Sequence, residues 1–298
     1  MICIFCHKDS SSSKSVEHII PESLGNTHHY LPKGYVCDEC NHYFAIKIEN
    51  SLLSQPYFVS LRHRNEILTK KGKLVKQQMI FPGALKNAEV TMQTTDKGII
   101  CSFDDEELYE TIKENDIHTM IGPYIPEPEY PNNIVSRFLA KCAYEFFLYN
   151  MGEQNYDLCV QELLGKETDI LKNLREYARY GKGNFWQYNQ RRICSEGCCV
   201  YDGKDEKYYE ILHEMMLFPK EYTKHPNGNV EAEIYFIVAI SGIEYAICIS
   251  DPDISAYKNL VELNGGQSPL EDKNEKRLPI GLSDVNPFLI KHTNKYNL

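Results

Sequence analysis

Two pairs of cysteines near the start of the chain are the residues best suited to bind a metal. Cys3 and Cys6 form one Cys-x-x-Cys pair, and Cys37 and Cys40 form a second pair after thirty intervening residues. Four thiolates at this spacing are typical of a tetrahedral structural zinc site, which leaves no open position for water. The spacing therefore predicts a Zn²⁺ ion that ties the two ends of this stretch together and is not itself catalytic.

Three further side chains in the same stretch are suited to hydrolysis. Glu17 and His18 are adjacent, and Asn41 directly follows the last cysteine. A carboxylate and an amide oxygen are ligands that Mg²⁺ accepts together with waters and a phosphate oxygen. A neutral imidazole beside such an ion can take a proton from water near pH 7. We therefore predict a catalytic Mg²⁺ or Mn²⁺ held by Glu17 and Asn41, with His18 as the general base of phosphodiester hydrolysis.

Short elements must position these groups. Residues 15–20 and 34–36 predict two short strands, and the apolar pattern after Asn41 predicts a helix that ends at Pro56. Two strands and one helix of this size cannot bury a sufficient core, so a metal staple is required. Glu49 lies about two helical turns after Asn41 on nearly the same face, which makes it a possible third oxygen ligand. The alternative for Glu49 is an acid on a solvated helix face.

In combination, the motifs resemble a known family. Cys-x-x-Cys, Glu-His-Ile-Ile-Pro and Cys-x-x-Cys-Asn before a helix are similar to the HNH endonuclease superfamily in its zinc-stapled, four-cysteine form, the ββα-metal fold, over about residues 1–55. The resemblance implies that Glu17 binds the catalytic cation, that His18 is the base and that Asn41 binds the metal. It also implies cleavage of DNA to 5′-phosphate and 3′-hydroxyl ends, in bacterial defence or in a mobile element. The doublet of the family is more often Asp-His, and its last His has no clear counterpart here.

The rest of the chain predicts a larger domain. We expect an HNH module over residues 1–56 and a mixed α/β domain over residues 57–298, which makes the fold class α+β. Residues 75–81 and 90–103 alternate in polarity like strands, and Asn133 precedes the apolar stripe of a central helix. A clear β-hairpin turns at Ser241-Gly242. The task of this domain is open between substrate selection, sensing, and formation of a homodimer or of a complex with a partner protein.

Composition and charge limit the class of protein, its partners and its cellular compartment. The chain is 42% hydrophobic and 25% charged, which is ordinary for a globular protein. Its net charge of −10 argues against general attraction to nucleic acid, but residues 1–76 hold ten Lys and Arg against seven Asp and Glu. The sequence shows no signal-peptide pattern and no apolar run long enough for a membrane span, and four of its eleven cysteines are at zinc spacing. We therefore expect a cytoplasmic protein with no membrane partner.

Further groups carry weaker predictions, each with a plainer alternative. His28 and His29 can contact substrate or be ordinary loop histidines. A run of six basic residues can cross DNA phosphates or form a solvated face. Trp186 lies among aromatic and arginine residues that can stack on bases or form a packing surface. The basic residues of the run are Arg62, Arg64, Lys70, Lys71, Lys73 and Lys76.

A second group of cysteines is the last metal candidate. Cys194, Cys198 and Cys199 could bind a metal together with His213, but their spacing fits no standard zinc pattern.

Two other functions are alternatives to the nuclease. A non-catalytic, zinc-dependent nucleic-acid-binding module would not need the acid, imidazole and amide together. A zinc deaminase needs His-x-Glu followed by Pro-Cys-x-x-Cys, which this sequence lacks.

Overall fold

The computed structural model describes residues 1–151, 164–165, 167–202, 207–211, 213–224, 230–271, 277–279 and 290–293. Helices and antiparallel sheets follow the N-terminal region, which confirms the predicted α+β class. The chain forms two compact units. The first comprises Met1–Pro21, Asn26–Asn50 and Tyr130–Leu298, and the second comprises Glu22–Gly25 and Ser51–Glu129. Residues 1–21 and 26–50 thus share a unit with the last part of the chain, and the boundary after residue 56 stays a prediction.

The helix that follows the second cysteine pair begins earlier than predicted. Helix α1 (Asp38–Phe44) starts directly after Cys37, whose side chain accepts a hydrogen bond from the Cys40 N–H. A π-helical stretch, η2 (Ala45–Glu49), and α2 (Asn50–Leu53) continue it. Pro56 does not simply end this helix but opens α3 (Pro56–Arg64), because proline is well tolerated in a first helical turn.

The predicted strands at residues 15–20 and 34–36 do not form. Instead His18 and Tyr30 make an isolated antiparallel bridge, supported by hydrogen bonds from the Ile19 N–H to the His29 carbonyl and from the Leu31 N–H to the Glu17 carbonyl. Residues 34–36 lead into α1 instead, with the Tyr35 carbonyl accepting from the Ile4 N–H at 2.9 Å. The segment around the doublet therefore pairs with residues 29–31.

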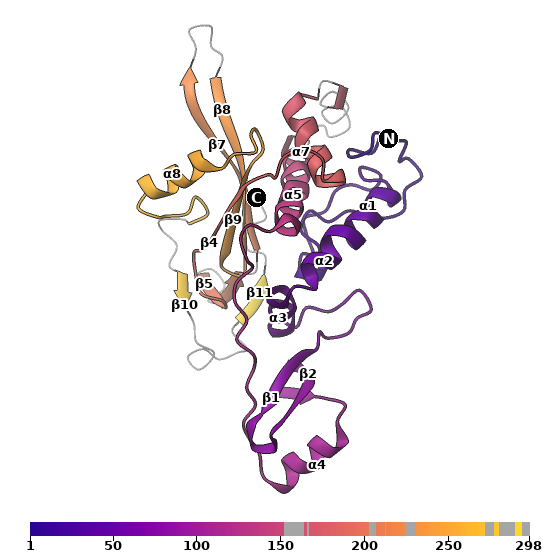
Figure 1. Ribbon diagram of the computed structural model, residues 1–298, viewed down its shortest axis with the longest axis vertical. Helices are drawn as coiled ribbons and strands as arrows, with labels where there is room; N and C mark the ends of the chain where they lie inside the picture. Colours follow the sequence, from indigo (N-terminus) through magenta and orange to yellow (C-terminus); the bar gives the residue numbers. More distant parts are fainter. Residues whose placement is uncertain are drawn as a thin grey trace. The chain divides into compact units, whose positions relative to one another are not determined.

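A long buried helix lies at the centre of the first unit. Helix α5 (Asn133–Met151) is capped by Asn132, one residue earlier than predicted, whose side chain accepts from the N–H groups of Ile134 and Val135. It packs along α7 (Asp169–Tyr180) and against strands β8 (Val230–Ile240) and β9 (Ile243–Cys248) of a sheet, so that it lies between that sheet and α1 (Figure 1). Its near-continuous apolar sequence fits a helix enclosed on several sides.

The sheet beside α5 contains the predicted hairpin. Its antiparallel order is β4-β9-β8-β7, and the turn at Ser241-Gly242 has φ values of 48° and 81°. A Cβ on Gly242 would lie 2.4 Å from the Cys194 carbonyl oxygen, so the turn requires glycine. Helix α8 (Ser255–Leu263) covers the face opposite α5. The strands are β4 (Tyr188–Arg192), β7 (His213–Lys224), β8 (Val230–Ile240) and β9 (Ile243–Cys248).

A second four-stranded sheet in this unit has the order β10-β5-β6-β11, with β11 parallel to β6 and the other pairs antiparallel. Its strands are β5 (Cys198–Asp202), β6 (Lys207–Ile211), β10 (Arg277–Pro279) and β11 (Ile290–Thr293). Across the described ranges, no helix is both long and apolar enough to cross a membrane.

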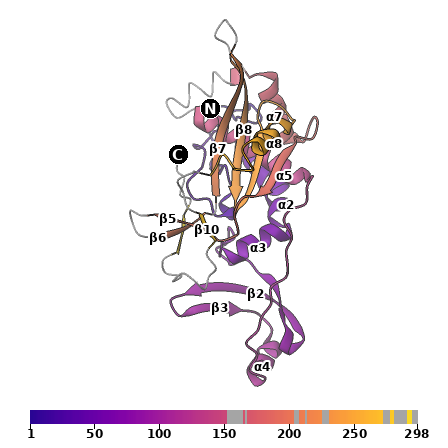
Figure 2. The same ribbon diagram turned by 90° about the vertical axis from the view of Figure 1, so that its left-hand side faces the viewer.

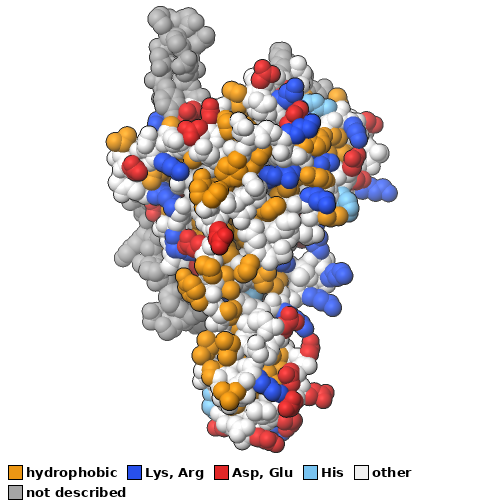
Figure 3. All heavy atoms as spheres, in the orientation of Figure 1, with side chains coloured by type: hydrophobic (Ala, Val, Ile, Leu, Met, Phe, Trp, Pro, Cys, Tyr) orange, Lys and Arg blue, Asp and Glu red, His pale blue; other side chains and the backbone are white. Residues whose placement is uncertain are grey.

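The second unit is built on a three-stranded antiparallel sheet in the order β1-β2-β3 (Figure 2). The predicted strand at 90–103 is in fact two strands, because the chain turns between Thr95 and Gly98. Met79, Phe81, Val90 and Leu108 form the core, and acidic side chains gather at the end that carries α4 (Figure 3). The remaining elements are η1 (Glu22–Leu24), β1 (Gln77–Phe81), η3 (Pro82–Ala84), β2 (Lys86–Thr95), β3 (Gly98–Ser102) and α4 (Glu106–Glu114).

Candidate active site and metal centre

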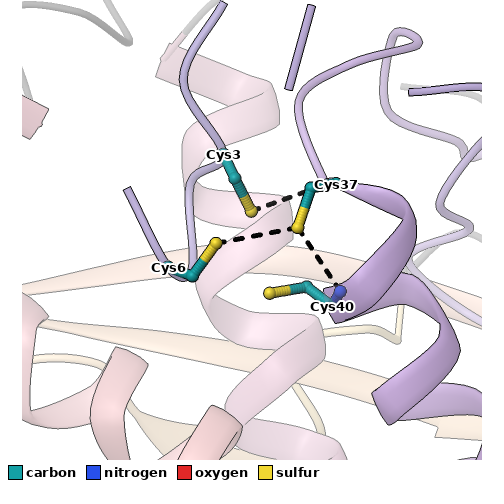
Figure 4. A group of neighbouring side chains, drawn as sticks. All are labelled: Cys3, Cys6, Cys37 and Cys40. Carbon is teal, nitrogen blue, oxygen red and sulfur yellow. Dashed lines mark hydrogen bonds between the residues drawn. The ribbon is translucent and has the colours of Figure 1, made fainter. Parts of the chain in front are cut away.

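The four predicted zinc ligands converge. The sulfur atoms of Cys3, Cys6, Cys37 and Cys40 all lie within 4.8 Å of one another, and the Cys6 and Cys37 sulfurs are 3.6 Å apart (Figure 4). Zinc–sulfur bonds of about 2.3 Å in a tetrahedron place sulfurs about 3.8 Å apart, so a Zn²⁺ ion fits this cluster. Among the residues that the structure describes, this is the only group of three or more His, Cys, Asp and Glu side chains gathered in this way.

Backbone N–H groups donate hydrogen bonds to two sulfurs of this cluster. The Cys37 N–H donates to the Cys3 sulfur at 3.3 Å, and the Cys40 N–H donates to the Cys37 sulfur at 3.4 Å. Hydrogen bonding by the Cys40 thiol lowers the pKa of Cys3 to about 4, whereas burial raises the pKa of Cys6 to about 11. Because a metal ligand must be a thiolate, zinc binding here would release protons.

The segment that carries the doublet is held from two sides. On one side it pairs with residues 29–31, and on the other it meets α5. The Lys141 ammonium donates to the His18 carbonyl at 2.9 Å, and the neighbouring Cys142 thiol donates to the Ile19 carbonyl at 3.0 Å. The backbone on which the candidate base is mounted is therefore fixed by a helix more than a hundred residues away in the sequence.

Glu17 and His18 point to different environments. The Glu17 side chain is buried against α5, and its carboxylate lies 2.6 Å from the Lys141 ammonium. The His18 side chain is half-buried, with its ring 5.9 Å from that of Tyr30. Adjacent residues of an extended segment alternate in direction, which accounts for this difference.

Lys141 is surrounded by acids. Besides Glu17, its ammonium lies 3.4 Å from Glu49 and 3.2 Å from Glu145 on the same helix, and its side chain is wholly buried. Burial alone would lower the pKa of Lys141, but the three carboxylates outweigh it and hold that pKa well above its usual value. Glu49 is therefore a buried partner of the lysine and not a solvated helix acid.

Asn41 lies on the first helical turn after the cysteines, as predicted. Its side chain is half-buried, and its amide nitrogen donates to the Val16 carbonyl at 3.1 Å. The amide therefore joins α1 to the residue directly before the doublet. His42, beside it, is exposed.

The structure places the weaker candidates for substrate contact in different environments. His28 is exposed, whereas His29 is buried and burial lowers its pKa. In the basic run Arg62 is buried, and the other five residues are exposed. Trp186 is buried, with its indole N–H bonded to the Cys248 carbonyl, which matches the packing alternative.

The second cysteine group does not gather into a metal cluster. Cys198, Cys199 and His213 are buried and Cys194 is half-buried, but in the described part of the chain no three of these ligand atoms converge as those of the first cluster do.

Sequence reasoning missed the residues of α5 that reach this site. Lys141 stands in the run Phe-Leu-Ala-Lys-Cys-Ala-Tyr-Glu-Phe-Phe, and its partner Glu145 follows one turn later. A Lys and a Glu four residues apart within an otherwise apolar helix signal a buried ion pair, because charged residues are rarely enclosed without a partner. That signal indicates a pair but does not name Glu17 as a further member.

Comparison with known proteins agrees with this region of the structure. A family model described as HNH endonuclease matches residues 3–56, which include the four cysteines, the Glu-His doublet and the asparagine. No curated protein and no solved structure matches the chain. Residues 3–56, called the HNH region below, therefore match the HNH endonuclease family and contain a four-cysteine cluster consistent with zinc binding.

Proposed function

We propose that the protein is a metal-dependent endonuclease that hydrolyses DNA phosphodiester bonds, with His18 as general base and with Glu17 and Asn41 as ligands of a Mg²⁺ or Mn²⁺ ion. The observation that carries the proposal is the HNH endonuclease match over residues 3–56, which contains all three residues together with the cysteine cluster. The half-buried His18 side chain, on a backbone fixed by α5, supports a role in which an imidazole must meet a water in one orientation.

Each residue has a distinct task in this proposal. His18 takes the proton of a water that attacks the phosphorus, and its fixed backbone limits the directions that the ring can adopt. Glu17 and Asn41 supply a carboxylate and an amide oxygen, a donor set suited to a hard cation. When bound, the ion would polarise the phosphate and stabilise the departing oxygen.

One observation favours the alternative, a non-catalytic zinc-dependent module that binds nucleic acid. The Glu17 carboxylate is 2.6 Å from a lysine and is buried, as an acid with a purely structural role would be. A carboxylate has two oxygens and about four lone-pair positions, so an ion pair through one oxygen is compatible with cation binding as well. The two functions differ in whether phosphodiester bonds are cut.

A plasmid-nicking assay separates these functions. Supercoiled DNA is incubated with the full chain and Mg²⁺, Mn²⁺ or EDTA, and the nicked and linear forms are quantified. We expect cleavage with either ion, none with EDTA, and a loss of roughly 10²–10⁴-fold for His18→Ala, the range that a general base contributes. DNA binding should persist in this variant.

His42→Ala is the matched control, because it removes an exposed histidine from the same region. This variant should cut like the unmodified protein, and both variants should retain zinc. DNA binding without cleavage under every metal condition would favour the non-catalytic module. Full cleavage by His18→Ala would reject His18 as the base.

A further inference from the structure

We propose that Arg179 is a positioning residue of the zinc centre, which holds the Cys40 sulfur in a fixed direction and slows loss of the metal. The inference goes beyond the proposed nuclease function because it concerns retention of the metal at the cysteine cluster. It also involves a residue far outside the matched region, since Arg179 belongs to α7, which lies in the later part of the chain.

The contact is direct and enclosed. The Arg179 Nε donates to the Cys40 sulfur at 3.3 Å across 139 positions of sequence. Cys40 is fully buried, and Arg179 is 7% exposed. Hydrogen bonds between ionised groups in such surroundings are stronger than those between neutral groups. Guanidinium stays charged under all ordinary conditions, so this donor is permanent.

The orientation of the guanidinium is fixed by neighbours. Its central carbon lies 3.7 Å from the centroid of the Tyr43 ring on α1, a close cation–π contact. The Tyr43 hydroxyl accepts from Arg137 at 2.8 Å, and Arg137 also donates to the Arg179 carbonyl at 3.3 Å. Arg179 therefore reaches the sulfur in a preset geometry, with little freedom to lose when the metal binds.

The charge of the cluster explains why such a donor matters. One Zn²⁺ and four thiolates carry a net charge of −2, which is costly in a buried place unless nearby groups offset it. Of the arginines close to the knuckles, Arg175 directs its guanidinium to the Glu167 carboxylate and the Phe5 carbonyl. Across the described ranges, Arg179 is the cationic side chain with a hydrogen bond to one of the four sulfurs.

A hydrogen-bond donor to a metal-binding sulfur affects how tightly the metal is held. The N–H···S bond withdraws charge from the sulfur and fixes its direction. Outer partners of metal ligands typically change metal affinity by about 10–100-fold when they are removed. A residue that merely packed α7 on α1 would change stability without a selective effect on the metal.

Transfer of zinc to a chromophoric chelator measures the effect. The full chain is loaded with one zinc per molecule, mixed with excess chelator, and the rate of zinc transfer is followed. We expect Arg179→Met to release zinc at least about tenfold faster than the unmodified chain. Arg179→Lys keeps a cation but lacks the planar stacking group, so its rate should lie between the two.

Arg175→Met is the control, because it removes an equally buried arginine of the same helix whose guanidinium donates to the Glu167 carboxylate and the Phe5 carbonyl. Zinc release within about threefold of the unmodified rate is expected for it, even if its melting temperature falls. Equal acceleration in the two Met variants would overturn the proposal, as would an unchanged rate in Arg179→Met. If Arg179→Met does not fold, the Arg179→Lys variant provides the test. A zinc-release rate equal to that of the unmodified chain, or to that of Arg175→Met, would then overturn the proposal. An unmodified chain without zinc would reject the zinc centre itself, whatever the nicking assay shows.

Discussion

Among single residues, Glu145 illustrates how burial changes the pKa of a carboxyl group. It is fully buried on α5, 3.2 Å from the Lys141 ammonium, which Glu17 and Glu49 also contact. Loss of hydration on burial raises the pKa of Glu145 well above its usual value despite the lysine, and repulsion by the neighbouring acids adds to the rise. Enclosure therefore favours the protonated form of Glu145.

Glu145→Gln should remove a pH-dependent cost to stability. Below about pH 4.5 the acid is protonated in both folded and unfolded chains, and its ionisation costs nothing. As the pH rises, the unfolded chain loses this proton and the folded chain keeps it, so stability falls until the pH passes the raised folded pKa. Glutamine has no such proton to lose, so the melting temperature of the variant relative to the unmodified chain should increase from pH 4.5 to pH 8.

Thermal melts of both proteins in matched buffers between pH 4 and pH 8 provide the measurement. The difference is expected to grow by a few degrees, since about 1 kcal/mol shifts the melting temperature of a chain of this size by roughly 2–4 °C. A difference that stays flat or shrinks with rising pH would contradict protonation of Glu145.

At the scale of elements, α5 acts as the support of the candidate site. Lys141 and Cys142, neighbours on this helix, bond to the carbonyls of His18 and Ile19, and Tyr144 donates to the Ile4 carbonyl beside the first knuckle. One helix therefore touches both the doublet and the cysteine cluster. Displacing α5 should disturb both.

Lys141→Met should destabilise the chain and abolish cleavage. Removing one partner of a buried ion cluster leaves its other charges uncompensated, which typically costs about 3–5 kcal/mol. The melting temperature should fall by roughly 10 °C, and DNA nicking should be lost because the Glu17 carboxylate and the His18 backbone lose their shared contact.

Lys172→Met, at an exposed position of α7, is the control and should leave the melting temperature and the nicking activity unchanged. A melting temperature within about 2 °C of that of the unmodified chain would contradict the claim that Lys141 compensates the buried carboxylates.

The sequence predicted those elements well whose structure depends mainly on residues close together in the chain. The cysteine pairs, the Ser241-Gly242 hairpin and the apolar stripe of α5 all follow from spacing within a few turns or strand positions. The strand expected at 34–36 did not form, because its backbone leads into α1 and the doublet pairs with residues 29–31 instead. Propensity alone cannot choose between two nearby partners for one short segment.

Long-range contacts at the site had no local signal. Arg179 approaches Cys40, and Lys141 approaches Glu17, across more than a hundred positions of sequence. Such contacts depend on which helix packs where, and the spacing of residues within a motif contains no information about that. The four-cysteine cluster was therefore foreseen from the sequence, whereas the groups that hold it were not.

For the molecule as a whole, the contacts suggest that the HNH region does not fold alone. Ile4, Phe5, Ile19 and Phe44 are fully buried, and Phe5 packs against Tyr144 of α5 with ring centroids 5.3 Å apart. Without the later helices these apolar side chains would meet water. The zinc cluster would have to compensate for that exposure by itself.

A fragment of residues 1–56 is therefore expected to be poorly structured even with zinc. Its two-dimensional amide NMR spectrum should show narrow dispersion, and its zinc affinity should be weaker than that of the full chain, because α5 and α7 are missing. The full chain under the same conditions is the control. A well-dispersed spectrum together with an unchanged zinc affinity would establish residues 1–56 as an autonomous module.

The central claim is that Glu17, His18 and Asn41 surround one catalytic cation. A crystal of the His18→Ala variant with DNA and Mn²⁺ tests it most directly, through the anomalous scattering of manganese. We expect a peak about 2.1 Å from a Glu17 carboxylate oxygen and from the Asn41 amide oxygen, in contact with a phosphate. A phosphate bound at the site with no manganese peak there, and with Glu17 engaged by Lys141 alone, would contradict the claim.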